Sequence, residues 1–486
     1  MLLISFVSAN SQIKYVTTTG NSSNNGESEA SAWSLTHAFK NARAGDIVHV
    51  KAGNYGDQQY EIKVSGTSGN PIVFKGYQNT PYDITTVDGQ GGSIVYAVNS
   101  QTDPTNSSLM PLIVEARVND VGSGEGIRIS GSFVQLENFQ VKYFRDAVVV
   151  NGTDNVTKNV LTFESGIYNP SVWGSDEFGV GLTGKAQGQG FVVTGDRHKT
   201  INCTTIKSGV HSMKFQFGDS QVGWGNRCYN LNDVNPTDYM YLIANGVTNR
   251  NDRNIYAHRE VGAAHESRGI VYHGNMPSNF NSLNEFEIWN TYLEYSYPLV
   301  QNNTAKNGLL IRETSAVNNN HQGGINIKNQ ANLLTFENIH LVNTAIWIKD
   351  QSDGLSGDVV GSGEDIVFNN ITGEIIKKPS ADIAAINFIT KWHEETASPT
   401  ARSIKFQNCT FDNYGFLFMD YHDAINIELT NCVLKDIKWY KRSSIDGRTG
   451  FALDAKGTNN KLINCGFSLP KGYTETATKV ETGRNN

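Results

Sequence analysis

A short motif built around an asparagine recurs along the chain and constrains the fold more than any other feature. The frame apolar-x-Asn-apolar-x-apolar, whole or in part, reads INC at 201–203, IWNTYL at 288–293, FENIHL at 336–341, FNNI at 368–371, FQNCTF at 406–411, LTNCVL at 429–434 and LINCGF at 462–467. Most neighbouring copies are separated by roughly 20 to 40 residues, a period typical of solenoids, in which each repeat packs on its neighbours. Numerous glycines (47) and few prolines (11) agree with short strands joined by turns.

A second recurring segment supplies a later strand in each repeat. It reads RGIVYHGN at 268–275, GGINIKN at 323–329 and TAIWIKD at 344–350. Because side chains alternate between the two faces of a strand, we expect Ile270 and Tyr272, and the isoleucines of the other two copies, to point inward. We therefore predict an all-β fold, a single parallel β-helix (solenoid) of about ten or more coils with loop insertions.

The asparagines and cysteines of the motif have structural interpretations. Asparagines at a fixed corner of the coils are expected to stack as a hydrogen-bonded ladder. Four of the five cysteines follow an asparagine, and we interpret their thiols as small buried apolar groups. An odd number of cysteines without CxxC or Cys/His spacing predicts neither a disulfide framework nor a zinc site.

The two ends of the chain differ from the repeats. Leu35, Ala38, Phe39 and Ala42 lie on one face of a predicted short N-terminal capping helix, which an open solenoid end requires. Residues 1–12, MLLISFVSANSQ, are interpreted as a signal-peptide remnant, which predicts a secreted or periplasmic protein. The β-helix is predicted over 13–470, followed by a C-terminal tail over 471–486. No other segment is apolar enough to span a membrane, so we expect no membrane insertion.

One part of the sequence is similar to a known superfamily. The run AFKNARAGDIVHVKAGNY (38–55), followed by GTSGNPIVFKGY (66–77), resembles the start of the right-handed parallel β-helix of the pectate-lyase-like superfamily. The resemblance implies a right-handed coil and a secreted polysaccharide lyase or glycoside hydrolase. The superfamily hosts several chemistries, so it does not by itself identify the reaction. Neither the paired-Asp and Gly-His-Gly motifs of polygalacturonases nor the Asn-Glu-Glu calcium ligands of alginate lyases are found in this chain.

The charge of the chain limits its partners. A formal net charge of -7 and a pI near 5.9 argue against a nucleic-acid partner, because such binders normally carry a basic surplus. An anionic polysaccharide would therefore have to bind at a local cluster of cationic side chains. The sequence predicts no oligomeric state.

Ionisable residues concentrate in AHREVGAAHESRGIVYHGN, residues 257–275. Aligning Asn254 with the motif asparagines places Tyr256, His258 and Glu260 on the outer face of one strand. The predicted turn that follows carries His265, Glu266 and Arg268, and His273 faces outward on the next strand. The candidate catalytic residues are His258, Glu260, His265, Glu266 and His273.

Neighbouring coils extend this predicted site. One predicted row contains His273, Asn302, Lys328 and Lys349, and a second contains Arg253, Trp289, Arg312 and Glu337. Glu294 is predicted beside His258, and Tyr292 beside Tyr256. Rings that stack on sugars and guanidinium groups that bind sulfate or carboxylate suit an anionic sugar chain. The candidate substrate-binding residues are Arg253, Tyr256, Arg268, Trp289, Tyr292, Glu294, Asn302, Arg312 and Lys328.

Two chemistries fit these residues. Hydrolysis needs two carboxyl groups, for which Glu260, Glu266 and Glu294 are candidates. A lyase needs a base such as His258, His273 or Lys328 and a cation beside the substrate carboxylate, supplied by Arg268, Arg312 or calcium. The density of carboxylates favours an endo-acting glycoside hydrolase on a sulfated, fucan- or carrageenan-like polymer. No cofactor is expected, with calcium as the alternative, and no metal ligands are assigned. A lyase on alginate or pectate, and a non-catalytic carbohydrate-binding adhesin, remain the other hypotheses.

Overall fold

The architecture was examined in a computed structural model of the whole chain. The structure describes residues 12–96, 102–116, 123–166, 188–208, 211–216, 221–230, 239–245, 255–258, 261–264, 268–274, 286–289, 292–295, 325–328, 332–342, 346–349, 364–374, 384–389, 402–414, 416–420, 427–436, 449–451 and 461–467. For several strands after residue 229, among them all strands between residues 239 and 328, the description covers the backbone alone. No helix among these residues has the length and apolar character needed to cross a membrane.

The chain forms two compact units, which are described separately. Unit 1 comprises Met1–Gly209 and Gln221–Arg227, and unit 2 comprises Val210–Ser220 and Cys228–Asn486. In each unit most described coils contain three successive strand segments, and each segment pairs with the equivalent segment of the next coil. We call the three sets of stacked strands the first, second and third rows. The prediction of an all-β, parallel β-helical architecture is confirmed, whereas the predicted limits 1–12, 13–470 and 471–486 stay predictions.

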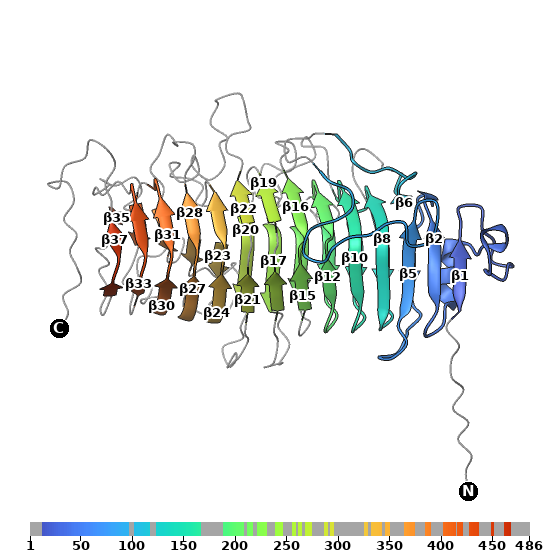
Figure 1. The fold of residues 1–486 in the computed structure, drawn as a ribbon, viewed down its shortest axis with the longest axis horizontal. Coiled ribbons are helices and arrows are strands. Elements are labelled where there is room, and N and C mark those ends of the chain that lie inside the picture. Colours follow the sequence, from blue (N-terminus) through green and yellow to red (C-terminus); the bar gives the residue numbers. More distant parts are fainter. Residues whose placement is uncertain are drawn as a thin grey trace, which may run out of the picture. The chain divides into compact units, whose positions relative to one another are not determined.

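The described strands of unit 1 pair in parallel. Its first row is β1 (Ile13–Val16), β2 (Ile47–Lys51), β5 (Ile72–Tyr77), β8 (Val134–Lys142), β10 (Val156–Phe163), β12 (Lys199–Ile201) and β15 (Gln221–Trp224). The second row is β3 (Gly53–Asn54), β6 (Pro111–Val114), the ends of β8 and β10, and β13 (Thr204–Ile206). The third row is β4 (Tyr60–Ile62), β7 (Glu125–Ile129), β9 (Asp146–Val150) and β11 (Gln189–Val193). Figure 1 shows β2, β5, β8, β10 and β12 side by side.

Unit 2 repeats the arrangement, and its last third-row strand is the exception because it pairs antiparallel to the preceding one. Its first row is β18 (Ile255–His258), β21 (Phe286–Trp289), β24 (Asn332–Glu337), β27 (Glu364–Asn369), β30 (Arg402–Gln407), β33 (Glu428–Thr430) and β36 (Lys461–Ile463). The second row is β16 (Arg227–Asn230), β19 (Val261–Ala264), β22 (Tyr292–Tyr295), β25 (His340–Val342), β28 (Thr372–Glu374), β31 (Thr410–Asp412), β34 (Val433–Lys435) and β37 (Gly466–Phe467). The third row is β14 (His211–Gln216), β17 (Tyr239–Asn245), β20 (Arg268–Gly274), β23 (Ile325–Lys328), β26 (Ile346–Lys349), β29 (Ala384–Ile389), β32 (Phe416–Asp420) and β35 (Thr449–Phe451).

A left-handed residue turns the chain from the first row into the second. The asparagines at this corner have φ between 51° and 62°, a region that asparagine tolerates better than most residues. We call them the corner asparagines: Asn138, Asn159, Asn202, Asn338, Asn370, Asn408, Asn431 and Asn464. The asparagine of the recurring motif is therefore a backbone requirement.

Side chains of the corner asparagines also join neighbouring coils. Asn370 Nδ2 donates to Asn338 Oδ1 at 2.7 Å, and Asn159 Nδ2 donates to Asn138 Oδ1 at 2.8 Å. Asn431 Nδ2 donates to Asn408 Oδ1 at 3.4 Å. The predicted asparagine ladder is confirmed at these positions.

The interior of the coils is apolar, and like side chains stack from coil to coil. In unit 2 the ring centroids of Phe336, Phe368 and Phe406 are 4.9 and 4.8 Å apart, and all three side chains are fully buried. Cys203, Cys228, Cys409 and Cys432 are buried free thiols, and Cys465 is half-buried. The interpretation of the cysteines that follow an asparagine as buried apolar groups is confirmed for Cys203, Cys409 and Cys432, whereas Cys465 is only partly buried.

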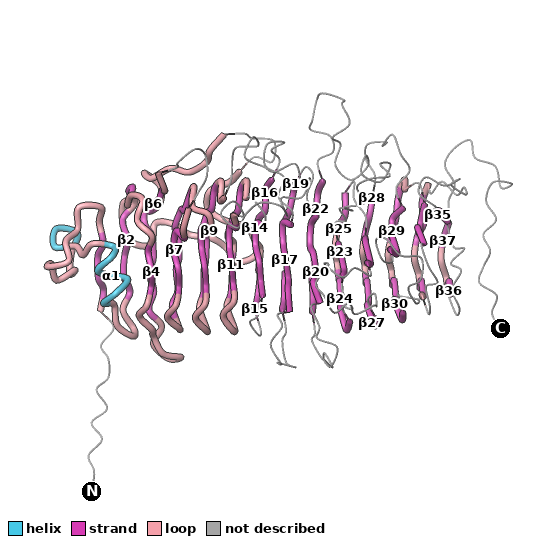
Figure 2. The backbone as a smooth tube through the Cα atoms, turned by 180° about the vertical axis from the view of Figure 1, so that it is seen from behind, coloured by secondary structure: helices cyan, strands magenta, loops and turns pink. Residues whose placement is uncertain are grey.

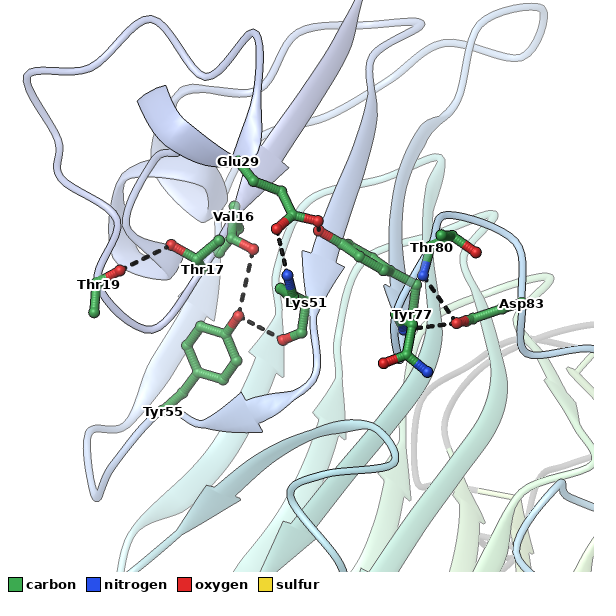
Figure 3. Close-up of polar contacts among 10 residues, drawn as sticks. Val16, Thr17, Thr19, Glu29, Lys51, Tyr55, Tyr77, Thr80 and Asp83 are labelled. Carbon is green, nitrogen blue, oxygen red and sulfur yellow. Dashed lines mark hydrogen bonds and ion pairs between the residues drawn. The ribbon is translucent and has the colours of Figure 1, made fainter.

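The N-terminal coil is closed by the predicted helix. The helix α1 (Leu35–Asn41) begins after Ser34, whose hydroxyl accepts the His37 N–H, and buries Leu35, Ala38 and Phe39. Figure 2 shows α1 beside β4, which it contacts. The preceding loop carries the short 3-10 helix η1 (Glu29–Ser31). Glu29 accepts hydrogen bonds from Lys51 and from Tyr77, which fixes this loop on β2 and β5 (Figure 3).

Candidate functional site

The ionisable stretch of the sequence lies on three strands of unit 2. His258 ends β18, and His273 lies in β20. Arg268 was predicted on a turn, but it is the first residue of β20, where its backbone pairs with Tyr239 of β17. That prediction is wrong because the third-row strand begins earlier than the apolar alternation indicates. The catalytic candidates Glu260, His265 and Glu266 fall outside the described residues.

The predicted row around Trp289 is correct on one side only. The backbone register pairs Trp289 with Glu337, as predicted, but pairs it with His258 on the other side instead of Arg253. The alignment of Asn254 as a corner residue is therefore wrong by five residues. Arg312 has no place in this row because β21 pairs directly with β24. Arg253 and Arg312 themselves fall outside the described residues.

The same five-residue error displaced two further assignments. Tyr256 lies beside Glu287 in the register, not beside Tyr292. Tyr292 lies in the second row, between Val261 of β19 and His340 of β25.

Glu294 is displaced in the same way. It lies beside Ala263 and Val342 in the second row, and not beside His258. In the described register His258 therefore lies beside Trp289, which was predicted beside Arg253, and not beside Glu294.

The cationic row is confirmed by the register of the third row. His273 of β20 pairs with Lys328 of β23, and Lys328 pairs with Lys349 of β26. Asn302 was predicted between His273 and Lys328, and that position is wrong because β20 and β23 are direct neighbours. Neighbouring strands lie about 4.8 Å apart, so three cationic positions follow one another at the spacing of the coils.

A second row of positions runs beside this cationic row on the same face. It consists of Val271, Asn326 and Trp347, each two residues before a member of the cationic row. Val271 pairs with Asn326, Asn326 pairs with Trp347, and Trp347 pairs with Asn387 of β29. By strand alternation we predict that Val271, His273, Asn326, Lys328, Trp347 and Lys349 share the face opposite the buried Ile346. We call this set the third-row face: Val271, His273, Asn326, Lys328, Trp347 and Lys349. An aromatic residue, an amide, a histidine and two lysines together suit an acidic sugar chain.

The second row carries a polar contact that the sequence analysis did not find. His340 Nδ1 lies 2.7 Å from Thr372 Oγ1, and its Nε2 lies 3.1 Å from Glu374 Oε1. The side chains of His340 and Glu374 are 37% and 42% exposed, so solvent or a ligand reaches them. An imidazole held between a hydroxyl and a carboxylate has a fixed orientation and can transfer a proton.

The first row adds an amide-carboxylate pair close in sequence to this histidine. Asn369 Nδ2 donates to Glu337 Oε1 at 3.0 Å, and both side chains are half-buried. Glu337 and His340 stand on either side of the corner residue Asn338. This cluster could have been found by counting from the corner asparagines, because His340 and Thr372 each follow one by two residues.

Metal binding was considered for the same residues. Within the described part of the chain, no group of three or more His, Cys, Asp or Glu side chains could hold a metal ion.

Comparison with known proteins bears on the fold. No family model matches the chain. A segment of 65 residues is 38% identical to an uncharacterized protein, YwoF, of Bacillus subtilis (strain 168), and it covers 13% of this chain and 14% of that protein. The match thus spans about a seventh of that relative.

Solved structures with a similar fold include enzymes that act on polysaccharides. A rhamnogalacturonan lyase is 13% identical with a TM-score of 0.48, covering 78% of this chain and 87% of its own. The pectate lyase Pel9A is 14% identical with a TM-score of 0.44, covering 87% and 78%. A GH136 lacto-N-biosidase from Eubacterium ramulus is 9% identical with a TM-score of 0.47, covering 94% and 68%. At these identities no residue role is carried over to this chain.

Proposed function

We propose that this protein is an exported enzyme that degrades an anionic polysaccharide bound along the third-row face of unit 2. The observation that carries the proposal is the register of His273, Lys328 and Lys349 on adjacent strands. The chain as a whole is acidic, with a formal net charge of -7, so two lysines on adjacent strands beside a histidine are a local exception. Such a run attracts carboxylate or sulfate groups repeated along a polymer. Trp347, in the adjoining position, offers a surface for a sugar ring.

The row of His273, Lys328 and Lys349 supports β-elimination best among the possible reactions. In that reaction a base removes the proton at C5 of a uronic acid, and the electron pair of the C–H bond forms a C4=C5 double bond. The C4–O bond breaks at the same time, and the departing oxygen takes a proton to become a hydroxyl group of the other fragment. A cation stabilises the charge that builds up on the neighbouring carboxylate. His273 is the candidate base and Lys328, in the next strand, the candidate cation. Calcium would be the alternative cation, and its involvement predicts loss of activity with a chelator and recovery with added calcium.

Hydrolysis of a sulfated polymer is the second candidate. It is supported by the exposed Glu374 and its 3.1 Å contact with His340, which together provide a carboxylate and a proton carrier in the second row. Glu260 and Glu266, the carboxylates favoured by the sequence, would add to this set.

The decisive assay follows two signals during one incubation. The purified protein is mixed separately with alginate, pectate, sulfated fucan and carrageenan, and reducing ends and ultraviolet absorbance are recorded. New reducing ends with a rise in absorbance indicate elimination, because only the unsaturated product absorbs. New reducing ends without it indicate hydrolysis. Binding to a polymer without new reducing ends or absorbance would support the non-catalytic adhesin and refute the enzymatic proposal.

Changing Lys328 and Lys349 together to Ala tests the binding face. We expect the affinity for the anionic polymer to fall roughly tenfold or more, because two charge-assisted contacts are lost. The dependence of binding on salt should weaken as well. Affinity is measured by electrophoresis through gels that contain the polymer. Lys405→Ala, which removes an exposed lysine of β30, is the matched control. An equal loss in the control would show that net charge alone matters.

A further inference from the structure

The connection between β5 and β6 in unit 1 is unusually long and well anchored. It spans residues 78–110, of which the structure describes 78–96 and 102–110. Connections of this length inside a compact fold usually have a function. We call residues 78–96 the strap.

The far end of the strap is fixed to the corner asparagines. Asn202 Oδ1 accepts the N–H groups of Gly89 and Gly91 at 2.9 and 3.1 Å, and Asn159 Oδ1 accepts the N–H of Ser93 at 2.7 Å. These amide groups are buried or nearly so, which makes the hydrogen bonds costly to leave unmade. The strap therefore lies across two coils in a defined position.

The near end of the strap is fixed by one carboxylate. Asp83 accepts the backbone N–H groups of Gln78, Asn79 and Thr80 at 2.9, 2.6 and 3.0 Å (Figure 3). These hydrogen bonds lie within the strap and close a tight turn directly after β5.

Tyr82 occupies this fixed end in a costly backbone conformation. Its φ is 70°, in the left-handed region that glycine and asparagine adopt more readily than tyrosine. Its side chain is nevertheless 51% exposed. The ring meets the ring of His49 edge-on, with centroids 4.9 Å apart, and the ammonium of Lys75 lies 5.4 Å from its centroid. A strained residue thus holds an aromatic ring at the surface.

The surface around Tyr82 continues onto the first row. Tyr15, His49 and Lys75 are neighbours in register on β1, β2 and β5, and the Tyr15 ring lies 5.7 Å from that of His49. Ile13, two residues before Tyr15 on β1, is 50% exposed. We call Tyr15, His49 and Tyr82 the aromatic platform.

The platform contains a polar atom without a partner. His49 is 1% exposed, and its Nδ1 has no hydrogen-bond partner among the described residues. Lys75 lies beside it and pairs with Glu137 at 2.7 Å. The exposed Tyr82 ring and the nearby Lys75 and Glu137 pair are suited to a ligand with both apolar and hydroxyl surfaces, and the buried His49 ring supports Tyr82 from below.

We propose that the aromatic platform of unit 1 is a second polysaccharide-binding site, separate from the third-row face of unit 2. The inference rests on the proposed function for the identity of the ligand, which is a stretch of the same polymer. The C–H face of a pyranose ring stacks on Tyr82, and its hydroxyl groups reach the Lys75 and Glu137 pair. A pre-oriented ring loses little conformational entropy when it binds, which explains why the strain at Tyr82 is retained.

The substitution that tests the platform removes the ring without harming the backbone. Asparagine adopts a left-handed conformation at lower cost, so Tyr82→Asn should unfold at a temperature within a few degrees of the wild type. Tyr82→Phe keeps the ring and is the matched control. Both variants and the wild type are compared by electrophoresis through gels containing alginate, polygalacturonate or carrageenan. We expect Tyr82→Asn to bind about tenfold more weakly and Tyr82→Phe to bind like the wild type.

The outcomes separate this inference from the proposed function. Weaker binding by Tyr82→Asn, with unchanged turnover of short oligosaccharides, supports the platform. Wild-type binding by Tyr82→Asn overturns the platform, and the enzymatic proposal then stands or falls on product formation. If binding depends on Tyr82 but the protein forms no product from any polymer, the platform is supported and the proposed enzymatic function is refuted.

Discussion

At the scale of single residues, the corner asparagines do two things that few side chains can combine. Each one accepts a left-handed backbone conformation, and the amides of several of them join neighbouring coils. Asn370 has φ 53° and donates to Asn338 at 2.7 Å while its own side chain is exposed. Because neither role needs burial, an exposed position becomes important for stability.

Replacing Asn370 separates the two roles. Asn370→Ala loses the hydrogen bond and places a Cβ residue without a local partner at positive φ, so the free energy of unfolding should fall by about 2 kcal/mol. Asn370→Gly loses the hydrogen bond alone, and the loss should be about 1 kcal/mol. Denaturant unfolding measures both values. Equal losses in the two variants would mean that the backbone conformation carries no cost at this corner.

The residues of the site show where sequence reasoning works and where it stops. Lys328 and Lys349 were paired correctly because INIK and IWIK are similar strands in similar positions. Arg253 was misplaced because Asn254, which is followed by an apolar residue, was taken for a corner asparagine. The same pattern also occurs in the turn before a strand, where asparagine is common. The contact between His340 and Glu374 joins side chains 34 positions apart in the sequence. It could not be predicted because it depends on the length of the coil between them, which local sequence patterns do not determine.

At the scale of elements, the coils are held together by equivalent side chains in equivalent strands. The first-row strands β24, β27 and β30 place Phe336, Phe368 and Phe406 in one stack. The apolar positions of this row were predictable from the recurring motif. The lengths of the segments that join the rows were not, and those lengths decide which outer residues become neighbours.

Truncating the middle ring tests how far the stack carries stability. Phe368 is fully buried between two rings, so Phe368→Ala should lower the free energy of unfolding by about 3–5 kcal/mol through lost burial and a residual cavity. Phe368→Leu fills most of that space and should cost about 1–2 kcal/mol. Chemical unfolding of both variants gives the comparison. A loss below 1 kcal/mol for the alanine variant would contradict a tightly packed core.

At the scale of the whole molecule, buried ionisable groups make folding depend on pH. His198 in unit 1 is fully buried, and burial lowers the pKa of its imidazole from 6.5 to about 3. The folded protein therefore keeps this side chain neutral at a pH where the unfolded chain protonates it. The stabilising contribution is complete above pH 6.5 and is lost as the pH falls towards 3.

Acid unfolding measures this contribution. Between pH 6.5 and 4.5 each unit of pH should remove about 1.4 kcal/mol through His198, so the wild-type melting temperature should fall steadily. His198→Gln cannot be protonated and should show a shallower decline, whatever its stability at neutral pH. Parallel declines in the two proteins would assign the acid sensitivity to other groups.

The strap has a consequence for the order in which unit 1 can assemble. Its hydrogen bond between Gly89 and Asn202 joins residues 113 positions apart, whereas neighbouring coils close over much shorter stretches. During synthesis the strap leaves the ribosome long before its docking site exists, and it must wait until β12 has formed. Solenoids usually grow one coil at a time, with each coil depending on the last. Here the strap follows an early coil but can dock only after the later coil that carries Asn202 has formed. Unit 1 should therefore fold and unfold as one cooperative body.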